Sequence, residues 1–342
     1  TIICQDVNCQ DGYIACAIGR LYDISGNLLD VDDFYTDNYG NYTITCSAIN
    51  LPDNWIVKFT GGIDTSTGEV NTKTFSAIGS GDTIIGVLVA SPLTTLITNI
   101  IESKATEDPA FDTATIEAEV NAAEDALRSL LDLDTSVNFN HDYMVDEDIE
   151  IATSISKLQV LTTAIAATAE TDEDNVFAVL SATISNAVLN PDSTENLFEA
   201  STINSIFTDV VELSTGSTET IPADTTSLAD YVNQVNTLID NAVTAAEDTE
   251  NDELGTVFEQ IFKSTNGVRM ASSNTVKDTG INFLVADTDI NALVSSVTTE
   301  AQTLAQTVSL EFPPIDQQPL LSGFFERDTA SNNIVKIYAP TL

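Results

Sequence analysis

The chain has 342 residues, of which 43% are hydrophobic, and it carries 53 Asp and Glu against 11 Lys and Arg, a formal net charge of -42 at pH 7. A surface this acidic repels phosphate backbones and anionic membranes, which argues against nucleic acid as a partner. The length exceeds one typical domain, and the apolar content is enough for substantial cores. The acidity favours solubility in a salt-rich or divalent-rich medium, although acidic residues that simply solvate helix faces would explain it equally well.

The first 90 residues have the pattern of β-structure. They are rich in Gly, Tyr, Thr, Ile and Val, and turn residues recur every 8 to 15 residues. Strands are predicted in the segments 11–23, 38–46, 54–62 and 68–78. In the second of these, Tyr42, Ile44 and Cys46 fall on one face. This spacing predicts a small antiparallel β-sandwich over residues 1–90.

The four cysteines, Cys4, Cys9, Cys16 and Cys46, all lie within this β region. Their spacing does not match the paired CxxC of a zinc site, so we expect disulfides, with three pairings open. Cys4 could instead bond to a neighbouring subunit. Disulfides indicate an oxidising compartment, and a chain that begins at Thr1 fits a mature form whose signal has been removed. Asn41, in Asn-Tyr-Thr, is the candidate N-glycosylation site.

Residues 84–101, IIGVLVASPLTTLITNII, form an uncharged stretch of eighteen residues. It is long enough to cross a membrane, but it contains Pro92 and Asn99 and no basic flank follows closely. Ser91 can cap a helix, and proline suits the first helical turn. We therefore expect a buried strand over 84–90 and then a helix from residue 92, with a domain boundary between residues 90 and 91.

From residue 91 to residue 308 apolar residues recur at helical spacing. Each stripe is one-sided, with acids and threonines opposite, which is typical of a helical bundle. Such stripes indicate core packing rather than metal or cofactor boxes. The stripes comprise Ile116, Val120, Ala123, Leu127 and Leu130; Ile151, Ile155, Leu158 and Ile165; Val176, Leu180, Ile184, Ala187 and Val188; Ile203, Ile206, Phe207, Val210 and Val211; and Leu228, Tyr231, Val235, Leu238, Ile239 and Ala242.

The last 34 residues, 309–342, change character again. Residues 310–319 contain three prolines and cannot be helical, whereas 323–340 predict a β-hairpin. Its strands could return to the sheet edge of the first region or add to the sheet of another subunit. The predicted fold class is therefore multidomain α+β, with an N-terminal antiparallel β-sandwich, an all-α bundle, and a Pro-rich linker with a C-terminal β-hairpin.

Catalytic patterns are not found in the sequence. The single histidine, His141, lies in a polar stretch without a nucleophile elbow or HExxH motif, and GSGD at 79–82 lacks the lysine and spacing of a phosphate loop. Asp64 is predicted to form a turn by bonding the backbone two residues on. Crowded oxygen ligands between residues 23 and 37 make a candidate Ca²⁺ site. That site would use Asp30, Asp32, Asp33 and Asp37, helped by Asp23 and Asn27.

Four segments carry a family resemblance: DGYIACAIGRLYD, TDNYGNYTI, FTGGIDTSTGE and SPLTTLITNII. In this order they resemble large secreted or surface proteins of marine and environmental bacteria, with relatives among aquatic viruses. The β region is similar to carboxypeptidase-regulatory-like or collagen-adhesin B-type sandwiches, which commonly serve as stalks and spacers. The resemblance covers about residues 11–103 and, more loosely, 130–134. At 23–33, DISGNLLDVDD departs from the family's calcium-type loop. The resemblance implies an extracellular structural role and no chemistry.

We therefore expect an extracellular or surface structural protein rather than an enzyme, a homo-oligomer or polymer that forms a filament, surface layer or virion exterior. Strand addition would join its subunits, through the tail hairpin or the N-terminal TIICQDVNC, and Cys4 or Cys9 could lock the contact. The alternative is an adhesin or receptor-binding module for glycan or protein, with Ca²⁺ in support. Its candidate contacts would be Tyr35 and Tyr39, and also Trp55 unless that residue belongs to the sandwich core.

Overall fold

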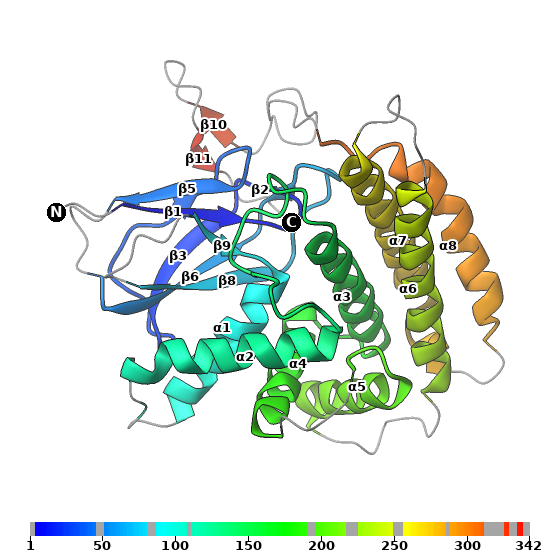
Figure 1. Cartoon of the computed structure of the whole chain (residues 1–342), viewed down its shortest axis with the longest axis horizontal. Helices are drawn as coiled ribbons and strands as arrows, with labels where there is room; N and C mark the ends of the chain where they lie inside the picture. Colours follow the sequence, from blue (N-terminus) through cyan, green and yellow to red (C-terminus); the bar gives the residue numbers. More distant parts are fainter. Residues whose placement is uncertain are drawn as a thin grey trace. The chain divides into compact units, whose positions relative to one another are not determined.

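The computed structural model describes residues 4–45, 51–80, 87–107, 111, 113–190, 196–216, 225–248, 256–284, 288–310, 325–327 and 334–337. The chain divides into two compact units (Figure 1). The first comprises residues 1–113, 140–142 and 309–342, and the second comprises 114–139 and 143–308. The described chain is thus mixed, with strands first and helices after them.

Strands of the first unit form three small sheets. The largest has the order β4-β3-β6-β8, a second has the order β5-β1-β9, and β2 pairs with β7. Neighbours pair antiparallel except for β1 and β9, which are parallel, a pair that the predicted antiparallel arrangement did not include. The bounds are β1 Cys4–Cys9, β2 Ile14–Ala15, β3 Ile18–Asp23, β4 Phe34–Tyr35, β5 Asn41–Thr45, β6 Asn54–Thr60, β7 Ile63–Asp64, β8 Thr74–Ser80 and β9 Val87–Ala90.

One hydrophobic core takes side chains from both larger sheets. Val7 and Ile44 come from the β5-β1-β9 sheet, and Trp55 and Phe59 come from β6 in the other. Trp55 packs so closely that a Cβ at Gly79 of β8 would lie 2.2 Å from its ring. Alternation along each strand places these side chains inside. Trp55 is 1% exposed, so it belongs to the core rather than to the candidate contacts.

The predicted strand 11–23 is broken between β2 and β3. Cys16 adopts a left-handed backbone with φ of 59°, which few non-glycine residues do. The buried hydroxyl of Thr36 lies at the break, where it accepts a hydrogen bond from Ala17 N at 2.9 Å and donates one to Ile14 O at 2.6 Å. A side chain about twenty residues away thus satisfies main-chain groups that a regular strand partner would otherwise satisfy.

Helix α1, Pro92–Glu107, begins where the sequence predicts it, and Ser91 caps it. Ser91 Oγ accepts from Thr94 N at 3.3 Å, and Thr94 Oγ1 accepts from Ser91 N at 2.8 Å, a reciprocal capping box. The same threonine donates to Ser76 O of β8 at 2.9 Å, and Thr95 Oγ1 accepts from Ser76 N at 2.8 Å. These bonds join α1 to the sheet, so α1 belongs to the first unit rather than to a bundle that starts at residue 91.

The C-terminal segment is described at its start and at two strands. Ser309 N donates to Ser66 O at 2.9 Å, which ties the start of the segment to the first unit. Strands β10, Phe325–Arg327, and β11, Ile334–Ile337, pair antiparallel with a register shift between Glu326 and Arg327. They form a two-stranded sheet of their own. The rest of the predicted hairpin lies outside the described residues.

Helices α2 to α8 make up most of the second unit. The α3 helix is buried on most of its surface and contacts α4, α5, α6 and α7, while α7 also contacts α8. Figure 1 shows α3, α6, α7 and α8 side by side within this unit. The bounds are α2 Ile116–Leu131, α3 Ile149–Thr168, α4 Glu173–Leu189, α5 Ala200–Thr215, α6 Thr226–Glu247, α7 Val257–Thr279 and α8 Ile290–Ala305, with a 3-10 turn at Gly280–Leu284.

The five predicted apolar stripes fall on α2 to α6, and most of their members are buried. The helix pair α7 and α8 packs through a glycine that no stripe marked. A Cβ on Gly267 would lie 2.6 Å from Ala301 O and 2.8 Å from Ala305 N, so this residue lets the two helices approach closely. The fully buried Tyr231 of α6 lies with its hydroxyl 3.0 Å from Ser272 Oγ of α7.

Some of the many acids cap the first turns of helices instead of lying on their exposed faces. Asp148 caps α3 by accepting from Ile151 N at 3.0 Å, and Asp289 caps α8 by accepting from Ala292 N at 3.1 Å. Both bonds satisfy main-chain donors that the first turn of a helix leaves without a partner. Among the described helices, none is long and apolar enough to cross a membrane.

Candidate functional site

The outer edge of β5 is the candidate functional site. Cys9 N donates to Gly40 O at 2.9 Å, which makes 9 and 40 a hydrogen-bonded pair. Antiparallel pairs alternate between bonded and non-bonded, so the main-chain groups of Thr43 and Thr45 point away from β1. Among the described residues, no strand pairs with β5 on that side. The outward N–H and C=O groups of these two threonines therefore offer a template for another strand.

The other outer strands are closed or very short in the part of the chain that the structure describes. The β8 edge is bonded at Ser76 by the threonines that begin α1. On β9, Val89 N donates to the side chain of Asn140 at 2.8 Å. The β4 strand has two residues, Phe34 and Tyr35. Because proteins commonly cover or shorten edge strands that must not pair, the contrast singles out β5.

A turn that begins with an aspartate holds β5 in place. Asp37 Oδ1 accepts from Tyr39 N at 2.8 Å and from Asn41 N at 2.9 Å, and Asp37 N donates to Asn41 O at 2.9 Å. An Asx turn of this kind gives the segment TDNYGN its shape. The chain then enters β5 with Tyr42 stacked on the Phe34 ring, the ring centroids 4.2 Å apart.

The outer face of the β5-β1-β9 sheet carries an exposed carboxylate beside the open edge. Asp6 of β1 lies opposite Thr43 of β5, and the threonine hydroxyl donates to Asp6 Oδ1 at 2.6 Å. Asn41, the predicted glycosylation site, is also exposed, and its side-chain oxygen accepts from Asn8 Nδ2 at 2.7 Å. The edge is thus polar on this face and apolar on the face of Tyr42 and Ile44, which packs on the core.

The predicted calcium ligands are not brought together. Asp33 receives two hydrogen bonds from the Arg20 guanidinium, at 2.8 and 2.7 Å, and this partner lowers the pKa of the carboxyl. Asp23 accepts from Ser25 N at 2.9 Å, and Asp37 forms the turn described above. Across the described residues no group of three or more His, Cys, Asp or Glu side chains could hold a metal ion. The structure described here therefore gives no support to a Ca²⁺ site at these carboxylates or at Asp30 and Asp32.

The described cysteines give no support to the predicted disulfides. Cys9 is a fully buried free thiol, and burial, with a further contribution from the charge of Asp11, raises its pKa well above the usual value. Cys16 is buried at the break between β2 and β3. Only the main chain of Cys4 is described, and Cys46 lies outside the described residues. A disulfide through Cys9 is therefore absent from the structure.

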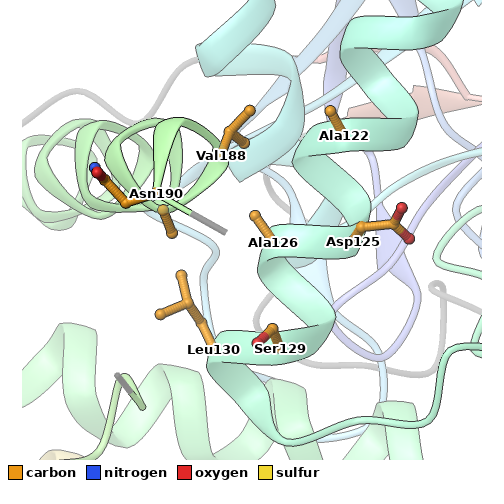
Figure 2. A pocket seen from close by; sticks show the side chains of 8 residues that line it. Ala122, Asp125, Ala126, Ser129, Leu130, Val188 and Asn190 are labelled. Atoms are coloured by element: carbon orange, nitrogen blue, oxygen red, sulfur yellow. The ribbon is translucent and has the colours of Figure 1, made fainter. Parts of the chain in front are cut away.

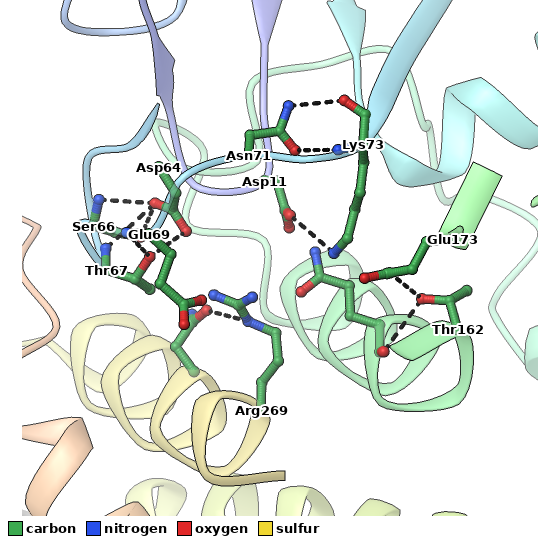
Figure 3. A network of polar contacts seen from close by, with 12 residues as sticks. Asp11, Asp64, Ser66, Thr67, Glu69, Asn71, Lys73, Thr162, Glu173 and Arg269 are labelled. Carbon is green, nitrogen blue, oxygen red and sulfur yellow. Dashed lines mark hydrogen bonds and ion pairs between the residues drawn. The ribbon is translucent and has the colours of Figure 1, made fainter. Parts of the chain in front are cut away.

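A buried polar cluster lies around the loop that follows β7 (Figure 3). Asp64 Oδ1 accepts from Ser66 N at 2.8 Å and its other oxygen from Thr67 Oγ1 at 2.9 Å, which confirms the predicted turn. Lys73 Nζ lies 3.7 Å from Asp11 Oδ2, with both side chains 9% exposed. Sequence reasoning missed this pair, because one lysine among many acids gives no signal of burial. Removing one partner of such a buried pair is strongly destabilising.

The remaining residues that the sequence analysis considered for binding or catalysis are two tyrosines and the single histidine. Tyr39 is 50% exposed at its turn and contacts the Tyr13 ring edge-on at 6.2 Å, while Tyr35 is half-buried. His141 is half-buried in the segment 140–142, and the adjacent Asp142 accepts from Tyr13 Oη at 3.1 Å. These side chains form no recognisable catalytic arrangement with one another.

A hollow of about 320 Å³ lies between α2 and α4 in the second unit. Figure 2 shows small side chains along it, and its one acid, Asp125, is paired with Arg128 at 2.8 Å. The lining residues are Ala122, Asp125, Ala126, Ser129, Leu130, Ala187, Val188 and Asn190. Among these described lining residues there is no group of side chains that could hold a metal ion.

Comparison with known proteins adds no relative: no family model, no curated protein and no solved structure matches the chain.

Proposed function

We propose that this chain is an extracellular structural protein, a self-assembling subunit of a filament, surface layer or virion exterior. Its first unit would serve as a β-sandwich that accepts a strand from a neighbour at β5. The observation that carries the proposal is the open outer edge of that strand, with the main-chain groups of Thr43 and Thr45 directed outward. The resemblance of residues 11–103 to stalk and spacer sandwiches points in the same direction.

The charge of the chain sets the conditions for assembly. Copies with a net charge of -42 repel one another, and this repulsion is screened over about 8 Å at physiological salt. Hydrogen bonds along a strand edge act at much shorter range. We therefore expect assembly to increase with ionic strength or divalent cations, as a salt-rich environment would provide.

The test removes one outward N–H from the edge. Thr43→Pro deletes the N–H that a new strand would bind, at an edge position where proline is tolerated because β1 does not use this group. Thr43→Val keeps the N–H and serves as the matched control. Circular dichroism and thermal melting would establish that both variants fold.

Assembly would be followed by sedimentation velocity and negative-stain microscopy in high salt. We expect ordered assemblies from the wild type and from Thr43→Val, and monomers from Thr43→Pro. Equal assembly of all three proteins would remove β5 as the acceptor edge. Monomeric wild type at every salt and divalent concentration would contradict the proposed function as a whole.

A second candidate function is recognition of a glycan or protein, and the exposure of Tyr39 favours it. An aromatic ring at a rigid turn is a common contact with sugars and with other proteins. Tyr39→Ala keeps the main-chain oxygen that Asn8 Nδ2 bonds at 2.8 Å, so the turn should remain. Specific binding on a glycan array that this change abolishes would favour the adhesin; an array without signal would leave the structural role.

A further inference from the structure

Resting on the proposed function, we propose that the strand received at β5 is β5 of a second copy, in a two-fold contact between two first units. The two strands would run antiparallel, with Ile44 opposite the Ile44 of the second copy. A contact of this kind uses the same surface on both copies and closes on itself, so it makes a dimer. A filament or surface layer would then be built from such dimers.

The turn before β5 sets where the contact begins. Asn41 also points away from β1, but the turn uses its main-chain groups. Asn41 N donates to Asp37 Oδ1, and Asn41 O accepts from Asp37 N, both at 2.9 Å. Among the described residues, the outward groups that remain for a new strand are therefore the N–H and C=O of Thr43 and Thr45.

These groups complement one another in one antiparallel register. With the two Ile44 residues opposite each other, Thr43 of each strand lies opposite Thr45 of the other strand. Both pairs direct their groups into the contact, so each pair exchanges two hydrogen bonds and the contact has four. With Thr43 opposite Thr43, the contact would have two, because Thr45 would face Asn41, whose groups the turn uses. The described edge therefore favours the register centred on Ile44.

This register also matches the faces of the two sheets. Side chains directly opposite each other in an antiparallel pair lie on the same face. Ile44 is 1% exposed on the core face, and Thr43 is exposed on the other face. The two cores would therefore lie on one side of a continuous sheet with the order β9-β1-β5-β5-β1-β9. A slip of one residue would place them on opposite sides.

The absence of charge on β5 allows two copies to meet there. Copies with a net charge of -42 repel one another, so a close contact requires a surface with few charges. The sequence of β5 is NYTIT, without a charged residue. On the neighbouring strand, the Asp6 carboxylate accepts from the Thr43 hydroxyl at 2.6 Å. The two Asp6 carboxylates would be at least about 14 Å apart, three strand spacings, where salt screens their repulsion.

The other described strands are less suited as the donor. The edges of β8 and β9 are bonded at Ser76 and Val89, and β4 has two residues. In the predicted donor TIICQDVNC, residues 4–9 form β1, which pairs with β5 on one side and β9 on the other. The prediction that this segment is donated is therefore wrong for these residues. The tail strands β10 and β11 are the competing donor.

A labelling experiment tests whether β5 is both donor and acceptor. Fluorescent Thr43→Pro is mixed with excess wild type and, separately, with excess Thr43→Pro, and association is measured by sedimentation velocity. In the two-fold contact the variant lacks one hydrogen bond with the wild type and two with itself. We expect the dissociation constant to rise about two- to thirteenfold with the wild type, and by the square of that factor with itself.

A separate donor strand predicts a different result. Thr43→Pro would still donate that strand to the wild type, and would fail only with itself. Self-association weakened more than about tenfold, together with binding to the wild type within about twofold of the wild-type affinity, would therefore overturn the two-fold contact. Thr43→Val, which keeps the N–H, is the matched control and should associate like the wild type.

Disulfide formation tests the register. The Cα atoms of a hydrogen-bonded antiparallel pair are about 5.5 Å apart, which a disulfide can span, whereas diagonal neighbours are about 7–8 Å apart. We expect a linked dimer when Thr43→Cys and Thr45→Cys copies are mixed and oxidised, and little from either alone. Mass spectrometry of the linked peptides, with the wild type as control, separates this bond from those of the native cysteines. A mixture without this link, or Thr43→Cys copies that link to themselves instead, would overturn the register.

The outcomes separate the two proposals. A wild type that stays monomeric under every condition contradicts assembly itself. Thr43→Pro that associates with itself as well as the wild type does would remove β5 as the acceptor. Thr43→Pro that binds the wild type normally but not itself would keep the acceptor edge and assign the donor to another strand, such as β11.

Discussion

The hydroxyl of Thr95, which accepts a hydrogen bond from the outer edge of β8, provides a sharp test of the fold. Thr95 Oγ1 accepts from Ser76 N at 2.8 Å, and the two residues are 3% and 1% exposed. Thr95→Val keeps the shape and removes the acceptor. The Ser76 N–H would then be buried without a partner, which costs about 1–3 kcal/mol. The Ser91 carbonyl, which also receives the hydroxyl, keeps its helical bond from Thr95 N at 2.9 Å.

The control is Thr98→Val in the same helix. Thr98 is as buried as Thr95, with 1% of its surface exposed. Its hydroxyl, however, donates to Thr94 O at 2.8 Å, a carbonyl within the same helix. Its loss leaves no main-chain group without a partner, so the cost should be small. Amide hydrogen exchange of residues 74–80 measures the difference directly. We expect exchange at Ser76 to accelerate about five- to hundredfold in Thr95→Val only. Equal acceleration in both variants would refute the reasoning.

Three further changes test packing and burial. Gly267→Ala should destabilise the second unit by about 1–3 kcal/mol in urea unfolding, because its Cβ would overlap Ala301 O; stabilisation, as helix propensity alone predicts, would contradict the close approach. Gly79→Ala should destabilise the first unit similarly by displacing the Trp55 ring, seen as a change in tryptophan fluorescence. Burial raises the pKa of Tyr231 to about 12. The stability that the neutral hydroxyl contributes is therefore complete below pH 10 and lost toward pH 12, a loss of about 3 kcal/mol. Tyr231→Phe should flatten this alkaline loss of stability, and an unchanged profile would contradict the burial.

Elements with strong local patterns were predictable. The strand around Tyr42 and Ile44 follows from alternation, and the start of α1 follows from Ser91 before a proline. The stripes of α2 to α6 follow from helical spacing. In each case the pattern of neighbours along the chain decides which face is buried, so one sequence is enough to read it.

Elements that depend on distant partners were missed. The α7 helix buries polar residues such as Asn266 and Ser272, so no apolar stripe marks it. The break at Cys16 depends on the Thr36 hydroxyl. The pairing of Asp33 with Arg20, thirteen residues earlier in the chain, was also not predicted. None of these contacts leaves a signal in local spacing.

The sequence by itself determined that a region of strands precedes a region of helices, that a helix starts after Ser91, and that the chain is acidic. Only the tertiary structure decided which strand edges are closed and which is open. An edge is closed when a hydroxyl, an amide or another strand reaches its main-chain groups, and those partners come from residues far along the chain. Ser76 is satisfied by α1 and Val89 by Asn140. The outward groups of Thr43 have no such partner strand among the described residues, and this difference locates the candidate site.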